Sequence, residues 1–363
     1  MSEGITESRN DSGMIINYRK YTFTKILIVV IILIALVLAI GISVTIGDYP
    51  IAFGDVFKII WNHICGRTYD PNTVEWWDDY IVWEERLPRI AAAVLCGVSL
   101  SVAGVAMQAL MKNPLADPYT TGISSGAMVG VTIALTLGLY APIFSSEMGL
   151  VFNAFLFGLI PSLVIVGVTR FKNTSPATVI LAGLAMSFMF SAISNIILVG
   201  SEAETVQEVY RWMVGSLNNV VSSQIGLMAF TTILGSLFFL ITAKQLNIIT
   251  TGDTTAKSLG LDTKKYRSVS LILLSFVIAE VVSVTGIMGF VGLVVPHMVR
   301  MFMGSDTRYV IPGSMALGAL LLVVSDILSR VIIDSGMPVG VILSFIGGPM
   351  FLFLIIKQRR DMW

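Results

Sequence analysis

Residues 26–46 read ILIVVIILIALVLAIGISVTI, a stretch of 21 residues without a charged side chain. A bilayer core is crossed by about 20 apolar residues in a helix, because backbone groups in lipid must pair within their own segment. The stretch is too long for the core of a signal peptide, and no small-residue cleavage site follows it. We therefore expect it to remain in the protein as a membrane anchor.

The whole chain has the composition of a membrane protein. Of its 363 residues, 55% are apolar and 13% are charged, against roughly 25% charged in soluble domains. Lys plus Arg and Asp plus Glu each number 23, so the net charge indicates no nucleic-acid partner. We predict an all-α polytopic membrane protein embedded in a lipid bilayer by about ten transmembrane helices. The predicted spans are residues 24–46, 88–111, 121–140, 149–169, 177–200, 224–243, 268–288, 289–303, 310–333 and 337–356.

Residues 268–303 can be read as two passes or as one broken pass. Two passes require a tight reversal near Gly286 and Gly289, and Pro296 would interrupt the second pass. We count two, because an even number of spans agrees with the distribution of charge.

The distribution of basic residues predicts the orientation. With the N-terminus inside, 17 of the 23 Lys and Arg residues fall on the inner side and six on the outer side, as the positive-inside rule requires. We expect the cell (cytoplasmic) membrane as the location, with both termini in the cytoplasm. The predicted organisation is a tail at 1–22, a transmembrane domain at 23–357 that includes a cytoplasmic loop at 244–267, and a tail at 358–363.

The chain contains weak signs of an internal repeat. At an offset of 182, Ser101-Val102-x-Gly104 recurs as Ser283-Val284-x-Gly286, and Pro114 matches Pro296. Pro176-x-x-Val-Ile-Leu recurs at Pro338. The order of these matches predicts that spans 2–5 and 7–10 are related units, and the odd number of passes between the copies makes them inverted, as in transport proteins. Chance similarity among apolar helices is the alternative.

Few residues suit catalysis, metal binding or ATP binding. Two cysteines, Cys65 and Cys96, and two histidines form no recognisable metal or disulfide pattern. No Gly-Lys pair occurs, so a P-loop is absent and any ATP hydrolysis must occur on another chain. We expect no catalytic residue, no metal site and no cofactor on this chain, and a membrane-embedded enzyme is the least favoured class.

Several ordered motifs resemble the FecCD family, the permease subunits of ABC importers for iron–siderophore, haem and vitamin B12 substrates. The resemblance covers about residues 23–357 and implies the type II importer permease fold. It also implies a second copy of the permease, two ABC ATPase subunits that bind ATP and Mg²⁺, and an extracytoplasmic substrate-binding protein. The motifs are Arg86-Leu87-Pro88-Arg89, Met107-Gln108, Asn113-Pro114-Leu115-Ala116-Asp117-Pro118, Gly122-x-Ser124-Ser125-Gly126-Ala127, Arg211-Trp212-Met213-x-Gly215, Gly289-Phe290-Val291-Gly292-Leu293-Val294-Val295-Pro296-His297-x-x-Arg300, and Asp326-x-x-x-Arg330 before Pro338-x-Gly340.

The loop at 244–267 contains a short predicted helix. Asp253 or Thr254 would cap its N-terminus, Ala256 and Leu259 would share one face, and Gly260 would end it. The resemblance implies that this loop contacts the ATPase; a solvated connector is the alternative. The residues assigned to coupling are Thr251, Gly252, Asp253, Ala256, Leu259 and Gly260.

Residues 113–118 break a helix with two prolines. Irregular backbone is tolerated in a membrane only where it is buried in protein or lines a water-filled cavity, so the segment is predicted to lie on the pathway, with a plain turn as the alternative. The resemblance implies that Asn113 and Leu115 narrow the cytoplasmic exit. It places a second constriction at about 174–178, which includes Thr174 and Ser175.

Three arginines lie on the outer side against the charge rule: Arg86, Arg89 and Arg330. The resemblance implies that they face outward and pair with carboxylates of the binding protein. The alternative is local neutralisation, by Glu84 and Glu85 for Arg86 and by Asp326, one helical turn away, for Arg330.

The leading hypothesis is the permease of an ATP-driven metal-chelate importer. An ion-coupled secondary transporter is the alternative, because Glu280 and Asp326 are carboxylates within predicted spans and could serve as coupling groups. The sequence assigns no role to Glu280, no identity to the chelate, and no choice between a homodimer and a heterodimer of permeases.

Overall fold

The computed structural model describes residues 3–47, 49–67, 69–140, 146–171, 176–332 and 337–357, and its regular elements within these ranges are helices. Each of the ten predicted spans coincides with one apolar helix, which confirms the all-α prediction. These helices are α1 (Glu3–Thr45), α4 (Leu87–Met111), α5 (Ile123–Leu137), α6 (Ser146–Phe171), α7 (Pro176–Val199), α9 (Ser222–Ile241), α12 (Thr263–Thr285), α13 (Val291–Met303), α14 (Thr307–Val331) and α15 (Val339–Lys357).

Seven of these helices in the described ranges are long and apolar enough to cross a membrane, and α5, α13 and α15 are shorter. The 15 residues of α5 and the 13 of α13 extend only about 22 and 20 Å at 1.5 Å per residue. Both helices follow an irregular segment, at 112–122 and at 286–290. Part of the bilayer thickness is therefore crossed by backbone that is packed inside the protein.

The segment 268–303 forms two helices. Helix α12 ends at Thr285, and Gly286 (φ +72°) begins the reversal that leads to α13. The expectation that Pro296 would interrupt the second pass is wrong, because α13 continues from Val291 to Met303. Proline cannot donate to the carbonyl four residues earlier, but the Gln108 amide of α4 donates to that carbonyl, on Gly292 (3.5 Å), and to Leu293 O (3.2 Å).

The two repeat units share a pattern of helix lengths. The first, α4–α7, has 25, 15, 26 and 24 residues, and the second, α12–α15, has 23, 13, 25 and 19, so the second helix is the shortest in both. Helix α4 ends near the point where α12 begins, because Lys112 and Arg267 both bind Asp253. The first helices of the units are therefore antiparallel, as an inverted repeat requires.

The residue matches at an offset of 182 are not structurally equivalent. Gly104 lies in the middle of α4, whereas Gly286 follows the end of α12, and Pro114 lies between helices whereas Pro296 is inside α13. Pro176 and Pro338 do correspond, since the first begins α7 and the second immediately precedes α15. The repeat is a property of the helices rather than of those matched residues.

Glycines bring α4 into backbone contact with two neighbours. A Cβ on Gly104 would lie 1.9 Å from Gly292 O of α13, and one on Gly97 would lie 2.4 Å from Gly318 O of α14. Small residues permit such close approach between helices in a bilayer. Helix α4 is consequently buried along most of its length at the centre of the bundle.

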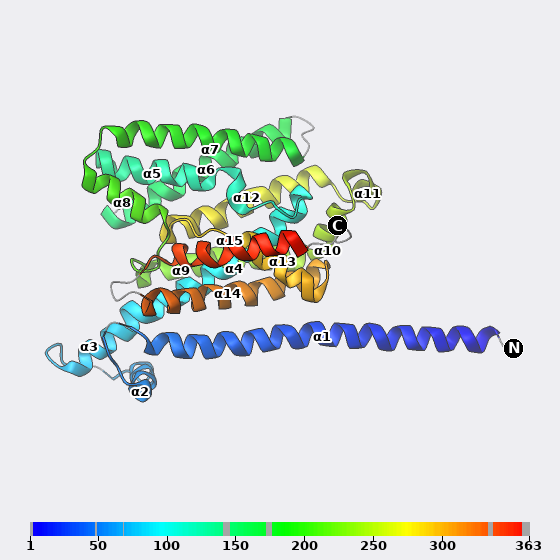
Figure 1. The fold of residues 1–363 in the computed structure, drawn as a ribbon, viewed down its shortest axis with the longest axis horizontal. Helices are drawn as coiled ribbons and strands as arrows, with labels where there is room; N and C mark the ends of the chain where they lie inside the picture. The colour runs from blue at the N-terminus through cyan, green and yellow to red at the C-terminus, as the bar shows by residue number, and fades with distance from the viewer. Residues whose placement is uncertain are drawn as a thin grey trace.

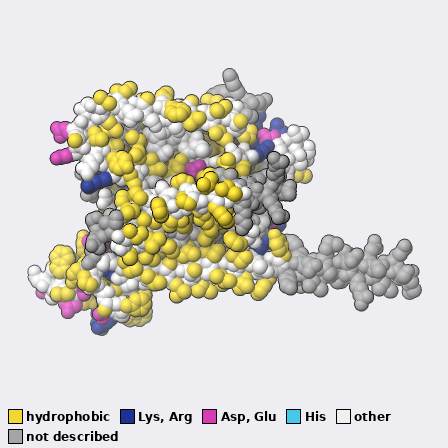
Figure 2. Space-filling model, viewed as in Figure 1, with side chains coloured by type: hydrophobic (Ala, Val, Ile, Leu, Met, Phe, Trp, Pro, Cys, Tyr) yellow, Lys and Arg dark blue, Asp and Glu magenta, His cyan; other side chains and the backbone are white. Residues whose placement is uncertain are grey.

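Shorter helices gather at the two ends of the bundle (Figure 1). At one end lie α10 (Ala243–Thr250) and α11 (Asp253–Ser258). At the other lie α2 (Phe53–Ile64), α3 (Val74–Tyr80), α8 (Ala203–Met213) and the π-helix η1 (Ile81–Arg86), which runs directly into α4. Figure 2 shows hydrophobic side chains over the flank of the bundle and most of the charged ones near its ends, as expected for a protein surrounded by lipid.

Candidate functional site

The end of the bundle that carries α2 and α3 contains a buried cluster of charges. Asp326 of α14 is fully buried and accepts from Arg89 Nε and from Arg330 Nη2, each at 2.7 Å. The expected pair between Asp326 and Arg330 is thus confirmed. Arg89 comes from α4, 237 residues away in sequence, so the carboxylate joins two helices.

Two of the arginines bind the end of α1. Arg330 Nη1 donates to Ser43 O (3.1 Å) and Ile46 O (2.5 Å), and Arg86 Nη1 donates to Val44 O (2.8 Å). The last carbonyls of a helix lack partners within it, and these guanidinium groups supply them. The expectation that all three arginines face outward is wrong for Arg86 and Arg330, which are turned inward toward α1. The Arg89 side chain is 17% exposed.

The segment after α4 is irregular, as predicted. Lys112 adopts a left-handed conformation (φ +50°) and ends the helix. Asn113 Oδ1 then accepts from Leu115 N (2.9 Å), and Asp117 caps a short 3₁₀ helix, η2 (Pro118–Thr121). The Leu115 side chain is 49% exposed. The predicted second constriction at Thr174 and Ser175 lies outside the described residues.

The irregular segments of the two repeat units meet inside the bundle. The Tyr119 hydroxyl lies 3.3 Å from both Met288 N and Met288 O, accepting from the first and donating to the second. A Cβ on Gly292, at the start of α13, would lie 2.7 Å from Pro118 Cδ. Backbone that leaves the helical pattern is therefore buried against protein, which satisfies the condition for irregular structure at membrane depth.

The loop at the opposite end contains the predicted short helix, α11, with two differences. Gly252 (φ +114°) is the N-cap and its carbonyl accepts from Ala256 N (2.9 Å), whereas neither Asp253 nor Thr254 caps the helix. Ala256 is fully buried while Leu259 is 63% exposed, so these two do not share a buried face. Gly260 (φ +85°) ends the helical segment as predicted.

Asp253 binds two cations instead of capping α11. Its Oδ1 accepts from Lys112 Nζ (2.5 Å) and from Arg267 Nη2 (3.1 Å), and its Oδ2 accepts from Arg267 Nη1 (3.3 Å). Partial burial acts to raise the pKa of Asp253, but the hydrogen bonds and positive charges of Arg267 and Lys112 outweigh it and lower the pKa to about 2. The carboxylate is therefore ionised at neutral pH and joins α4, α11 and α12.

Helix α10 is attached to the beginning of α14. Asn247 Nδ2 donates to Asp306 Oδ1 (2.8 Å), and Asn247 Oδ1 accepts from Thr307 N (2.9 Å). The Thr307 hydroxyl donates to Ala243 O (2.6 Å). The loop between α9 and α12 is thus fixed to the bundle at two points, one on α4 and one on α14.

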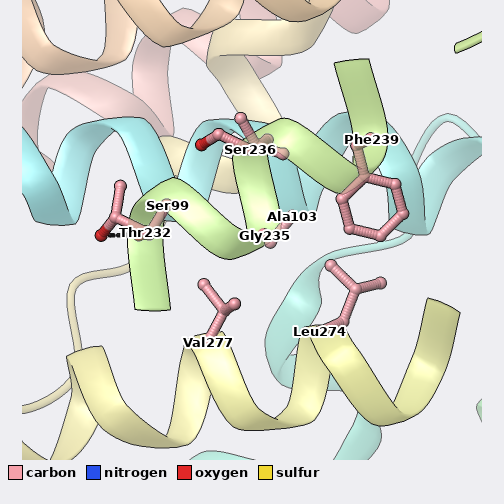
Figure 3. Close-up of a pocket in the computed structure, with 9 residues that line it drawn as sticks. Ser99, Ala103, Thr232, Gly235, Ser236, Phe239, Leu274 and Val277 are labelled. Atoms are coloured by element: carbon pink, nitrogen blue, oxygen red, sulfur yellow. Dashed lines mark hydrogen bonds between the residues drawn. The ribbon is translucent and has the colours of Figure 1, made fainter. Parts of the chain in front are cut away.

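A small cavity lined mostly by apolar side chains, with three hydroxyl groups, lies where α4, α9 and α12 meet (Figure 3). Ser99 and Thr232 hydrogen bond to each other on one side of it (2.8 Å), and Ser236 Oγ has no partner in the described part of the chain. Its volume of about 10 Å³ has room for about one water molecule. A chelate cannot enter a space of that size.

Glu280 of α12 is buried about one helical turn from Val277, which lines this cavity. Its Oε2 accepts from Thr231 Oγ1 of α9 (3.0 Å), and its Oε1 has no partner among the described residues. The pair of Glu280 and Thr231 is separate from Asp326, which binds arginines at one end of the bundle. Within the described ranges, no three His, Cys, Asp or Glu side chains are grouped to hold a metal ion.

Comparisons with known proteins extend over nearly the whole chain. Residues 27–357 match the FecCD transport family. A protein of Methanocaldococcus jannaschii named as an ABC transporter permease is 36% identical, covering 94% of this chain and 98% of that protein. The hemin transport system permease protein HmuU of Yersinia pestis is 35% identical, and the match covers 84% of this chain and 89% of that protein. A solved inward-facing structure described as a metal-chelate type ABC transporter matches with a TM-score of 0.78 at 27% identity. The match covers 91% of this chain and 99% of that one.

Proposed function

The chain belongs to the FecCD transport family, and we propose that it carries a metal chelate across the cytoplasmic membrane into the cell. It is the permease subunit of an ABC importer. The observation that carries the proposal is the family match over residues 27–357, which includes both irregular segments and both ends of the bundle. The substrate class follows from the relatives, one named for hemin transport and one described as a metal-chelate transporter.

ATP hydrolysis is assigned to separate ATPase subunits. The chain has no Gly-Lys pair and hence no P-loop. The surface proposed to dock the ATPase is the loop of α10 and α11, at the end of the bundle away from α2 and α3 (Figure 1). Leu259 is exposed there, and nothing lies within 4 Å of a Cβ built on Gly260, so both positions are accessible to a partner.

We assign the pathway to the interface between two copies of the chain. Two cavities between the described helices, each about 10 Å³, are far smaller than the several hundred Å³ of a site for a bulky ligand. Helices α7 and α15 also expose large apolar side chains, among them Phe188, Ile196 and Phe345.

Crosslinking tests this arrangement. In a Cys65→Ser background, which removes the exposed native thiol, Asn113→Cys and Leu115→Cys should each form a disulfide-linked dimer. Labelling of the new thiols by maleimide without any dimer would contradict a shared exit.

The substrate-binding protein is proposed to dock at the end of the bundle that carries α2 and α3. Arg89 supports this because its guanidinium is partly exposed beside the Asp326 cluster. Arg89→Gln should slow capture of the binding protein, and high salt should slow the wild type similarly, since rim charges act mainly on association rate. If the Arg89→Gln variant captures the binding protein at low salt as fast as the wild type does, Arg89 serves only to bind Asp326.

Transport into proteoliposomes tests the function as a whole. The permease is reconstituted with its ATPase subunits and binding protein, and a ferric hydroxamate, hemin and cyanocobalamin are compared as substrates. We expect uptake of one class that requires ATP on the side of α10 and α11. Uptake driven by a proton or sodium gradient without ATPase subunits would instead establish the secondary-transporter alternative.

A further inference from the structure

Lys112, Asp253 and Arg267 join the loop proposed for ATPase docking to the segment proposed for the exit. Lys112 is the last residue before Asn113 and Leu115, and Asp253 is the first residue of α11. Their side chains meet at 2.5 Å although 141 residues separate them in sequence. Resting on the proposed function, we infer that this ionic cluster transmits movement of the loop to the exit, with Lys112 as its positioning residue.

The carboxylate of Asp253 connects the loop to both α12 and α4. Arg267 is almost fully buried and holds both oxygens of Asp253, so the carboxylate stays attached to α12. Lys112 extends from the end of α4 to the same carboxylate and is the only one of the two cations that adjoins the irregular segment. A displacement of α11 therefore pulls on Lys112 and, through one peptide unit, on Asn113.

The backbone at Lys112 supports a mechanical role. A left-handed conformation is unfavourable for a residue with a side chain, yet Lys112 adopts φ +50° where glycine is the usual residue. The amide of Asn113 returns to Gln108 O (3.1 Å) and completes the end of α4. A lysine at this position provides the charge that a glycine would lack.

The primary variant is Lys112→Met, which removes the ammonium but leaves Asp253 paired with buried Arg267 and is therefore expected to fold. Lys112→Arg restores the charge, and Lys112→Gly relieves the backbone without restoring the charge. Arg308→Met is the matched control, because it removes an exposed cation of another ion pair at the same end of the bundle, outside the loop at 244–267. All are compared in proteoliposomes with the ATPase subunits and binding protein bound.

The measured quantity is substrate transported per ATP hydrolysed. We expect Lys112→Met and Lys112→Gly to retain the ATPase subunits and hydrolysis but to lower this ratio about fivefold or more, the range of ordinary coupling between sites. Lys112→Arg and Arg308→Met should keep the wild-type ratio. A general loss of folded protein would lower both activities together and leave the ratio unchanged.

A second readout follows the exit directly. In the Cys65→Ser background, Leu115→Cys should react with maleimide at a rate that changes when ATP is added, and Lys112→Met should abolish that response. An unchanged ratio and an unchanged ATP response in Lys112→Met, with ATPase subunits bound, would overturn the inference while leaving the proposed function intact. Failure of the wild type to bind ATPase subunits would instead overturn the proposed function.

Discussion

Asp326 of α14 accepts a hydrogen bond of 2.7 Å from Arg89 of α4, and this contact joins the two helices at the end that carries α2. The same helices are joined at their middle by the contact of Gly97 with Gly318. At the far end, the loop of α10 and α11 binds both of them through Asp253 and Asn247. Helices α4 and α14 therefore form a continuous unit between the two surfaces proposed to contact partners.

The Asp326 carboxylate should be important for stability. Asp326→Asn leaves two largely buried guanidinium groups without their anion, and breaking a buried ion pair costs about 3 kcal/mol or more. We expect a clear fall in thermal stability in detergent, followed by tryptophan fluorescence. Asp79→Asn, which alters a pair near the protein surface, is the control, and equal stability of the two variants would contradict the structural role of Asp326.

The backbone contact between α4 and α13 at Gly104 and Gly292 leaves no room for a side-chain methyl group. In Gly104→Ala the new Cβ would lie 1.9 Å from Gly292 O, so the helices must separate, at a cost of about 3 kcal/mol. The yield of monodisperse protein should fall. Gly226→Ala places its Cβ in open space on α9 and should keep the normal yield; a similar loss in both variants would contradict this explanation.

Substitutions at Gly260 can separate a steric clash with the ATPase from strain in the backbone of the chain itself. Its φ of +85° disfavours side chains, but a Cβ there meets no atom of the chain within 4 Å. We expect Gly260→Arg to insert normally and to lose ATPase binding in a pulldown, because only a docked partner would meet the long cation. Gly260→Ala carries the same backbone strain, about 1–2 kcal/mol, and should retain binding. Equal loss in both would assign the effect to strain.

The pKa of Asp253, lowered to about 2 from an ordinary 3.8, predicts the pH dependence of the loop that contains α10 and α11. A carboxyl with a lowered folded-state pKa contributes stability that is fully present above pH 3.8 and is lost as the pH falls toward 2. The degree of local opening in residues 243–260, obtained from hydrogen exchange after division by the intrinsic exchange rate at each pH, should therefore rise in the wild type as the pH falls from 4 to 2. In Asp253→Asn this corrected opening should be larger and independent of pH over the same range, and a constant difference between the two proteins would contradict the assignment.

The sequence alone was sufficient for features that depend on local chemistry. Lipid requires backbone pairing within each segment, so the apolar runs located all ten helices, and the glycines at 260 and 286 marked where helices end. The prolines at 114 and 118 marked the irregular segment, because proline has no backbone N–H to donate within a helix. Pro296 does not interrupt its helix, because the Gln108 side chain that binds the carbonyl left without a donor comes from another helix.

The charged clusters were decided by the tertiary structure. Arg86 and Arg330 lie on the outer side by their sequence positions, but burial of the end of α1 beside them provides unpaired carbonyls that turn both inward. Asp253 has the sequence position of a helix cap, yet it binds Lys112 because folding brings the end of α4 to within hydrogen-bonding distance. Sequence determines which segments become helices, since those hydrogen bonds are local; the partners of a buried charge are determined by which helices pack together, since an ion pair in a low-dielectric interior forms between neighbours in space.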